Sequence, residues 1–187
     1  KPRGSFFVEA RMGTPNLLKN IMFNVALKKM GRREETAYHP VAACYLVTYR
    51  CELDCVYCLE NAGHRCPDGV PRELDTAGAL ETLKGIRKTC DVIDISGGEP
   101  ALRTDLEQLL GACRELEFNE IMLNSNGLHL LERPEMLRHV HTVVLGIDSL
   151  REEPWLQITR GSPAQYSAQM QAIEELVELR SKYQFDI

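Results

Sequence analysis

The feature that most constrains the fold is an alternation of short apolar runs with stretches of helical periodicity, which begins near residue 41. Four apolar runs have the length and the β-branched content of buried strands, and they lie at 41–49, 91–96, 120–124 and 142–148. Four stretches have the apolar spacing of helices, and they lie at 76–88, 104–117, 133–139 and 162–182. Strands separated by helices indicate βα units, so we predict an α/β fold with a parallel sheet.

The chain divides into two expected regions, an N-terminal extension at 1–40 and a core at 41–187. Within the extension, apolar side chains gather on one face of residues 15–30 and indicate an amphipathic helix. Basic residues at the end of this helix would suit an anionic membrane surface, so we weigh peripheral membrane contact against packing on its own domain. A further strand is predicted to start at 183–187, and we therefore expect the natural chain to continue.

Composition narrows the class of protein. The 187 residues are enough for one sizeable core, and the net charge of −5 argues against a nucleic-acid surface, which needs clustered Lys and Arg. No apolar run is long enough to span a membrane. The seven cysteines are an odd number, which disfavours a disulfide framework and indicates a cytoplasmic protein. Three of them, Cys44, Cys90 and Cys113, lie in apolar or helical stretches and are expected to be buried.

Cys51, Cys55 and Cys58 form a C-x3-C-x2-C triad directly after the first predicted strand. Iron–sulfur cubanes are usually held by four thiolates, so a site that offers three leaves one iron open for another ligand. An open metal position is typical of catalytic metal sites. The alternative is a structural zinc site in which Cys66 supplies a fourth thiolate, and the chain would then be a zinc-stabilised binding module.

A polar segment follows each predicted strand. These segments are the cysteine triad, Gly97–Pro100, Ser125–Gly127 and Asp148–Leu150. Because the carboxyl ends of parallel strands share one edge of the sheet, where ligands bind, we expect the four segments to form one site. The Gly97–Gly98 pair would let the backbone approach a ligand closely and leave carbonyl groups for a ligand ammonium.

With these motifs in place, the chain resembles the radical S-adenosylmethionine (SAM) superfamily, in particular its viperin-like, molybdenum-cofactor-cyclase-like and hopanoid-enzyme-like branches. The resemblance rests on C-x3-C-x2-C and on Gly-Gly-Glu-Pro at 97–100, and it covers about residues 41–187. It implies a partial (β/α) barrel of radical SAM type, of which this sequence would supply four βα units and the start of a fifth.

The resemblance also implies a role for individual residues. Cys51, Cys55 and Cys58 would be the catalytic residues that ligate a [4Fe–4S] cluster, whose open iron chelates SAM. The cofactor-binding residues implied for SAM are Tyr57, Gly97, Gly98, Glu99, Ser125, Asn126, Asp148 and Arg160. Among these, Glu99 would receive the methionyl ammonium and Arg160 would pair with the SAM carboxylate. Many relatives have a serine two residues before the aspartate of the fourth strand, and this chain has Gly146 there.

The activity implied by the resemblance is reductive cleavage of SAM to a 5′-deoxyadenosyl radical, which abstracts hydrogen from a substrate. The substrate would be a small molecule, a lipid or isoprenoid, or a peptide, and the electron donor would be of the flavodoxin or ferredoxin type. The missing serine keeps a second alternative open, in which the chain is a catalytically degenerate scaffold that binds a partner without turnover.

Overall fold

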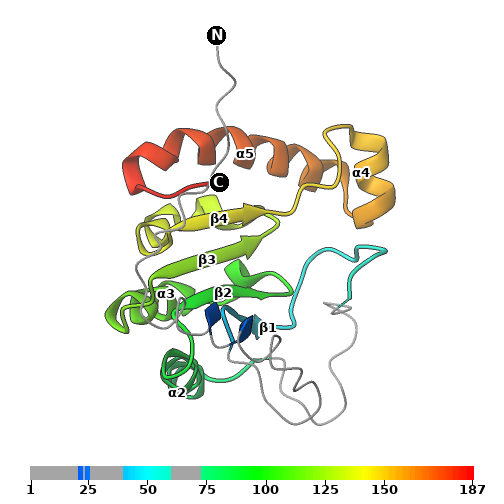
Figure 1. Ribbon diagram of the computed structural model, residues 1–187. Helices are drawn as coiled ribbons and strands as arrows, with labels where there is room; N and C mark the ends of the chain where they lie inside the picture. The colour runs from blue at the N-terminus through cyan, green and yellow to red at the C-terminus, as the bar shows by residue number, and fades with distance from the viewer. Residues whose placement is uncertain (1–20, 23, 26–39, 60–72) are drawn as a thin grey trace.

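The computed structural model describes residues 21, 22, 24, 25, 40–59 and 73–187 (Figure 1). Four strands form one parallel sheet in the order β1-β2-β3-β4, so the predicted α/β fold is confirmed. The strands are β1 (Ala43–Thr48), β2 (Val92–Gly97), β3 (Glu120–Ser125) and β4 (Thr142–Leu145). The α-helices are α2 (Thr76–Arg87), α3 (Leu106–Glu115), α4 (Glu152–Thr159) and α5 (Pro163–Tyr183). Three short 3-10 helices are η1 (Pro100–Leu102), η2 (Leu130–Glu132) and η3 (Pro134–His139).

The structure corrects the end of one expected strand, because β4 stops at Leu145 instead of residue 148. It stops there because β3 ends at Ser125, whose carbonyl accepts the Gly146 N–H at 2.9 Å as the last bond between the two strands. The short helix expected at 133–139 is present as the 3-10 helix η3. Helix α4 was not predicted from the sequence.

The predicted start of a fifth strand is confirmed at one residue. Asp186 forms a parallel bridge with Thr142. The Val143 N–H donates to the Asp186 carbonyl at 2.7 Å, and the Asp186 N–H donates to the His141 carbonyl at 2.8 Å. Residue 186 therefore extends the sheet on the free edge of β4.

Two helix starts follow directly from sequence. The Asp75 carboxylate accepts the Gly78 N–H at 2.8 Å and caps α2. The Ser162 hydroxyl accepts the Gln165 N–H, and the Gln165 side chain accepts the Ser162 N–H, so a capping box begins α5 with Pro163 at its first position.

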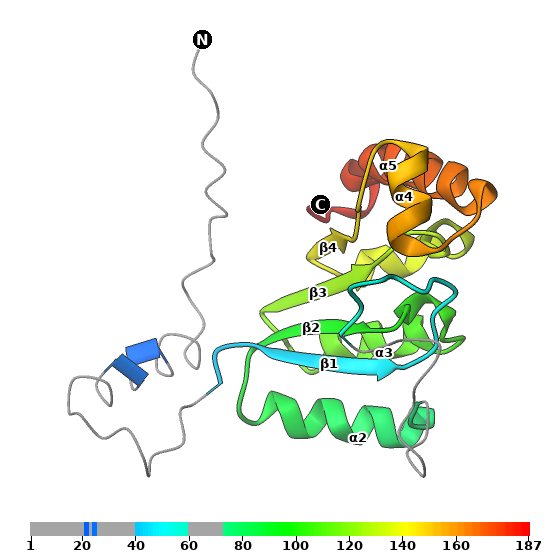
Figure 2. The same ribbon diagram turned by 90° about the vertical axis from the view of Figure 1, so that its right-hand side faces the viewer.

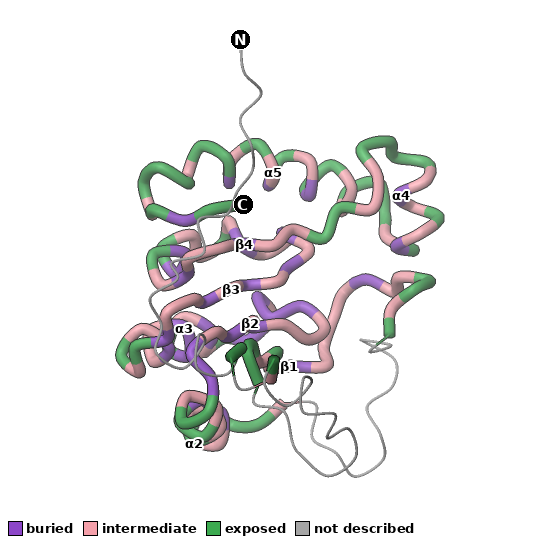
Figure 3. Tube along the Cα trace, in the orientation of Figure 1, coloured by how far each residue is buried: buried purple, intermediate pink, exposed green. Residues whose placement is uncertain are grey.

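The two faces of the sheet differ in burial (Figure 3). On the helix-covered face, alternate strand residues such as Ile93, Ile95, Ile121 and Leu123 are fully buried and form the core. The residues between them face the opposite side and are half-buried or exposed. Cys44 lies on that second face and is exposed, so the prediction that it is buried was wrong, whereas Cys90 and Cys113 are buried as expected.

Most of the predicted amphipathic helix at 15–30 lies outside the described residues. Residues 21, 22, 24 and 25 are helical, and three apolar side chains among them are largely exposed, namely Ile21, Met22 and Val25. Membrane contact through this helix stays a prediction, which flotation with anionic vesicles would test. Within the described part of the chain, no helix has both the length and the apolar character needed to cross a membrane.

Candidate active site

A cavity of about 390 Å³ lies where the strands end, next to the segment that follows β1. This segment lies on the right-hand side of Figure 1, which is the side that faces the viewer in Figure 2. Its size is typical of ligand sites, and its place is the one expected for a parallel sheet. Nine predicted site residues line it, namely Cys51, Cys55, Tyr57, Cys58, Gly97, Gly98, Ser125, Asn126 and Asp148. Glu99 and Arg160 are predicted site residues that do not line it. The sequence did not single out four other lining residues, Leu53, Leu59, Ser96 and Asn124.

The three cysteines of the triad form no disulfide bond and are partly exposed. The Cys58 N–H donates to the Cys55 carbonyl at 3.0 Å, which closes a turn between the last two cysteines. Burial raises the pKa of Cys51 to about 12 and that of Cys55 to about 11, and neighbouring carboxylates add to both shifts. These thiols therefore stay protonated at neutral pH until a bound cation favours the thiolate form.

The arrangement of the triad fits a cluster better than a single ion. In the described part of the chain, no group of three His, Cys, Asp or Glu side chains is placed to hold one metal ion. A cubane binds each thiolate at a different iron, so thiols spread along the wall of a cavity can serve it. Cys66, the fourth ligand of the zinc alternative, lies outside the described residues.

The Gly97–Gly98 pair brings the end of β2 against the chain that leaves β1. Gly97 has φ +136°, and a Cβ at this position would lie 2.3 Å from the Thr48 carbonyl oxygen. A Cβ on Gly98 would lie 2.2 Å from the Arg50 carbonyl oxygen. The Gly98 N–H donates to the Thr48 carbonyl at 2.8 Å, and the Glu99 N–H donates to the Arg50 carbonyl at 2.7 Å. The glycines thus permit a close approach between two segments of the protein, in addition to exposing backbone in the cavity.

The Glu99 side chain joins two loops. It is fully buried, and its carboxylate accepts the Ala101 N–H at 2.9 Å, the Ser125 hydroxyl at 2.8 Å and the Asn126 N–H at 2.8 Å. Glu99 does not line the cavity itself, and it holds Ser125 and Asn126, which do. A contact between Glu99 and the methionyl ammonium of SAM stays a prediction.

The environment of Glu99 predicts a pH dependence of stability. Burial raises the pKa of this carboxyl from 4.5 to about 7, against the opposing effect of its three hydrogen bonds. The folded state therefore holds this proton more tightly than the unfolded state does. The contribution of this proton to the free energy of unfolding is fully present below pH ~4.5 and is lost as the pH rises through ~7. Its total is about 3 kcal/mol.

Urea unfolding at a series of pH values would measure this loss. Glu99→Gln should flatten the profile between pH 5 and 8, whereas Glu135→Gln, at an exposed carboxyl, should leave it unchanged. A profile with the same slope in wild type and Glu99→Gln would contradict the assignment.

Asn126 ties the third loop to the cysteine segment. Its side-chain amide donates to the Glu52 carboxylate at 2.8 Å, and its backbone carbonyl accepts a hydrogen bond from the Gln169 side-chain amide at 2.7 Å. Gln169 also donates to the Gly146 carbonyl at 3.1 Å and accepts the Trp155 indole N–H at 2.6 Å. Gln169 was not predicted as a site residue. It lies at helical spacing from Ala172 and Leu176, on the buried face of α5, and a polar residue on such a face indicates a buried hydrogen-bonding role.

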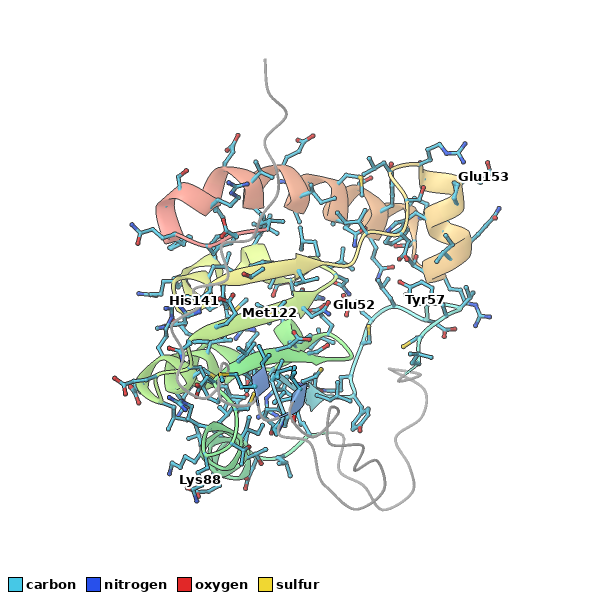
Figure 4. All side chains as sticks on the ribbon, in the orientation of Figure 1. Glu52, Tyr57, Lys88, Met122, His141 and Glu153 are labelled. Carbon is cyan, nitrogen blue, oxygen red and sulfur yellow. The ribbon has the colours of Figure 1, made fainter. Side chains whose placement is uncertain are left out.

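Asp148 and Tyr57 meet at the mouth of the cavity. Burial and a hydrogen bond to the Asp148 carboxylate raise the pKa of the Tyr57 hydroxyl. Asp148 also raises the pKa of Cys55 by its charge. Figure 4 labels Tyr57 and Glu52 on the segment that carries the cysteines, at the edge where the strands end.

Arg160 lies at the end of α4 with φ 55°, and its guanidinium donates to the Asp54 carboxylate at 2.8 Å. Asp54 precedes Cys55, so Arg160 contacts the cysteine segment from outside the cavity. The structure therefore does not group Arg160 with the residues that line the cavity.

The chain belongs to the radical SAM superfamily, whose sequence pattern matches residues 45–185. The predicted family is thereby confirmed, and membership of it implies the predicted cofactors, a [4Fe–4S] cluster and SAM. This chain is 36% identical over 122 residues to a GTP 3′,8-cyclase of Pelotomaculum thermopropionicum, and the match spans 62% of this chain and 36% of the cyclase. This chain is 31% identical over 119 residues to a 7,8-dihydro-6-hydroxymethylpterin dimethyltransferase of Methanocaldococcus jannaschii, and this second match spans 62% of this chain and 23% of that enzyme.

Solved structures share the fold. Streptococcus suis SuiB bound to S-adenosylmethionine superposes with a TM-score of 0.55 at 22% identity, over 90% of this chain and 44% of SuiB. Native anSMEcpe with bound AdoMet and Cp18Cys peptide superposes with a TM-score of 0.55 at 18% identity, over 78% of this chain and 41% of that chain. This chain thus spans less than half of each of these four proteins.

Proposed function

We propose that the intact protein is a radical SAM enzyme that cleaves SAM reductively and uses the resulting 5′-deoxyadenosyl radical to remove hydrogen from a substrate. The observation that carries the proposal is that the triad, the ends of β2 and β3 and the segment after β4 surround one cavity. When bound, a reduced [4Fe–4S] cluster would supply the electron for cleavage, and Cys51, Cys55 and Cys58 would hold it. A cytoplasmic flavodoxin or ferredoxin would be its electron donor.

The remaining lining residues would bind and orient SAM. The backbone groups of Gly97 and Gly98 and the polar groups of Ser125 and Asn126 lie in the wall of the cavity, together with Tyr57 and Asp148 at its mouth. We assign Glu99 a supporting function because its carboxylate is already satisfied by hydrogen bonds from two loops. This set of residues also argues against a degenerate scaffold, since each of the four strands contributes to the cavity at its end or through the segment that follows it.

Anaerobic reconstitution of the intact protein with iron and sulfide tests the site. We expect about four iron and four sulfide per chain, with brown absorbance. One zinc per chain, with no sulfide, would support the zinc-stabilised module and overturn the proposal.

The face of the sheet opposite the helix-covered face indicates which chemical groups a substrate could present. Asp94 lies on this face of β2, in register with Cys44 and with Met122, which Figure 4 labels. One carboxylate oxygen of Asp94 is buried without a hydrogen-bond partner. Asp94 is two residues, or about 7 Å, from Ser96 in the wall of the cavity. Its position next to the site suits a substrate group that donates a hydrogen bond or carries positive charge.

A triphosphate is a poor match for this face. In the described strands, the residues of this face include Asp94 and no Lys or Arg, whereas phosphate binding usually relies on such cations. We therefore propose that GTP, named as the substrate of the cyclase relatives, is not the substrate here. Small molecules, peptides and lipids that present a donor group are all compatible with Asp94.

GTP turnover tests this part of the proposal. With cluster, SAM and dithionite present, we expect added GTP to leave the rate of 5′-deoxyadenosine formation unchanged and to give no cyclised product. The Pelotomaculum cyclase serves as the positive control in the same assay. A GTP-dependent product from this protein would contradict the inference drawn from the lack of Lys and Arg on this face of the described strands.

A further inference from the structure

The end of α4 is capped by the cysteine segment. The last carbonyl groups of a helix have no partner within the helix. Here the Thr159 carbonyl accepts the Asp54 N–H at 3.0 Å, and the Ile158 carbonyl accepts the Val56 N–H at 2.9 Å. Two segments that are about 100 positions apart in sequence thus satisfy each other's backbone groups.

These two bonds lie on either side of Cys55. Residues 54 and 56 both direct their N–H groups at α4, so the backbone on each side of Cys55 is fixed to this helix. Cys55 itself lines the cavity. The backbone pairing with α4 therefore fixes the position from which the Cys55 side chain reaches the cavity.

Side chains reinforce this pairing. The guanidinium of Arg160 is 2.8 Å from the Asp54 carboxylate, and the left-handed conformation of Arg160 turns the chain sharply at the end of α4. Leu53 is 6% exposed, and a Cβ on Gly161 would come within 3.1 Å of it and within 2.6 Å of the Trp155 ring. Leu53, Gly161 and Trp155 are thus in close contact beside the ion pair.

Helix α4 is itself fixed to the rest of the protein. Trp155 is fully buried, and its indole N–H donates to Gln169 of α5 at 2.6 Å. Its ring meets Tyr166 edge to face, with 5.7 Å between the ring centroids. A helix held in this way can orient a loop that caps it.

We propose that α4 acts as a clamp on the cysteine segment and that Arg160 is a positioning residue, which acts through Asp54 to aim Cys55, instead of a residue that binds SAM. The inference rests on the proposed function because it assigns Cys55 to a cluster. It also explains why Arg160, predicted to contact SAM, lies outside the cavity.

A double-mutant cycle tests the pair in the intact, reconstituted protein. Arg160→Gln, Asp54→Asn and the double variant should each lose the cluster to a chelator about two- to fivefold faster than wild type, the range for one exposed ion pair. The double variant should be no worse than either single variant, since all three break the same contact. Arg160→Lys should restore part of the loss.

The matched control is the ion pair between Arg138 and Glu107, at 3.1 Å and with similar exposure, on α3 and η3 away from the cavity. Arg138→Gln should lose the cluster at the wild-type rate. Hydrogen exchange adds a readout that needs no cluster, because Arg160→Gln should speed exchange at the amides of residues 54 and 56 in the apoprotein and Arg138→Gln should not.

Three results would overturn the clamp. The first is that Arg160→Gln and Arg138→Gln behave alike in cluster loss and exchange. The second is that the effects of Arg160→Gln and Asp54→Asn add. The third is that Arg160→Gln weakens SAM binding, measured by the SAM-induced change in the EPR spectrum of the reduced cluster, while Asp54→Asn does not. If wild type takes up no cluster, the proposed function fails instead, and the exchange data still decide whether Arg160 orders this segment.

Discussion

Gly98→Ala should abolish the site and destabilise the fold by roughly 4–5 kcal/mol, the range of the most disruptive single substitutions. The added Cβ would lie 2.2 Å from the oxygen and 2.7 Å from the carbon of the Arg50 carbonyl, and both atoms belong to the backbone. A backbone clash cannot be relieved by turning a side chain. Relief would require β2 to move away from the cysteine segment and break the bond between Glu99 N–H and the Arg50 carbonyl.

Urea unfolding of the apoprotein measures this effect. Gly85→Ala is the matched control, because a Cβ at Gly85 in α2 would meet nothing within 4 Å. That variant should be more stable than wild type by about 0.5–1 kcal/mol, since alanine favours a helix over glycine. If Gly98→Ala unfolds within 1 kcal/mol of wild type, the close packing of the two segments is not required.

Cys55→Ala should remove both the cluster and the activity. Two thiols cannot replace three around a cubane, and Cys55 is the one whose two backbone neighbours are bonded to α4. We expect the brown absorbance near ~400 nm and the formation of 5′-deoxyadenosine to fall to background, while the apoprotein keeps its fold because Cys55 is only partly buried.

Cys44→Ser is the matched control for this substitution. Cys44 is an exposed cysteine outside the cavity, so its loss should leave cluster content unchanged. A Cys55→Ala variant that retains a full cluster would contradict the assignment of the triad, and so would a Cys44→Ser variant that loses it.

The sequence was sufficient to predict the strands, the parallel sheet and the gathering of four polar segments at one edge. Apolar runs reported the strands because both faces of a parallel sheet are at least half-buried. The parallel topology alone places the segments after the strands at one edge of the sheet. This explains why nine of the predicted residues line one cavity.

Helix α4 could not be predicted because little in its own sequence stabilises it. It has eight residues, with Pro154 in its first turn and the β-branched Ile158 and Thr159 in its last turn. Its stability comes from Trp155 and from the N–H groups of residues 54 and 56, which are distant in sequence. Tertiary contacts of this kind leave no local pattern.

The direction of two side chains was also beyond the sequence. Spacing placed Glu99 and Arg160 at the correct edge, and the resemblance assigned both to SAM. In the structure Glu99 accepts hydrogen bonds from Ser125 and Asn126, and Arg160 donates to Asp54. Neither Glu99 nor Arg160 lines the cavity. In both cases a partner from another loop decides the direction, and these partners are known only once the loops are placed in space.

The central claim is that the cavity holds a cluster and SAM in a geometry competent for cleavage. The most direct test is to reduce the reconstituted intact protein with dithionite under anaerobic conditions, add SAM and measure 5′-deoxyadenosine by mass spectrometry. The account predicts 5′-deoxyadenosine from wild type and none from Cys55→Ala. A wild-type protein that carries a full cluster and yet forms no 5′-deoxyadenosine would contradict it.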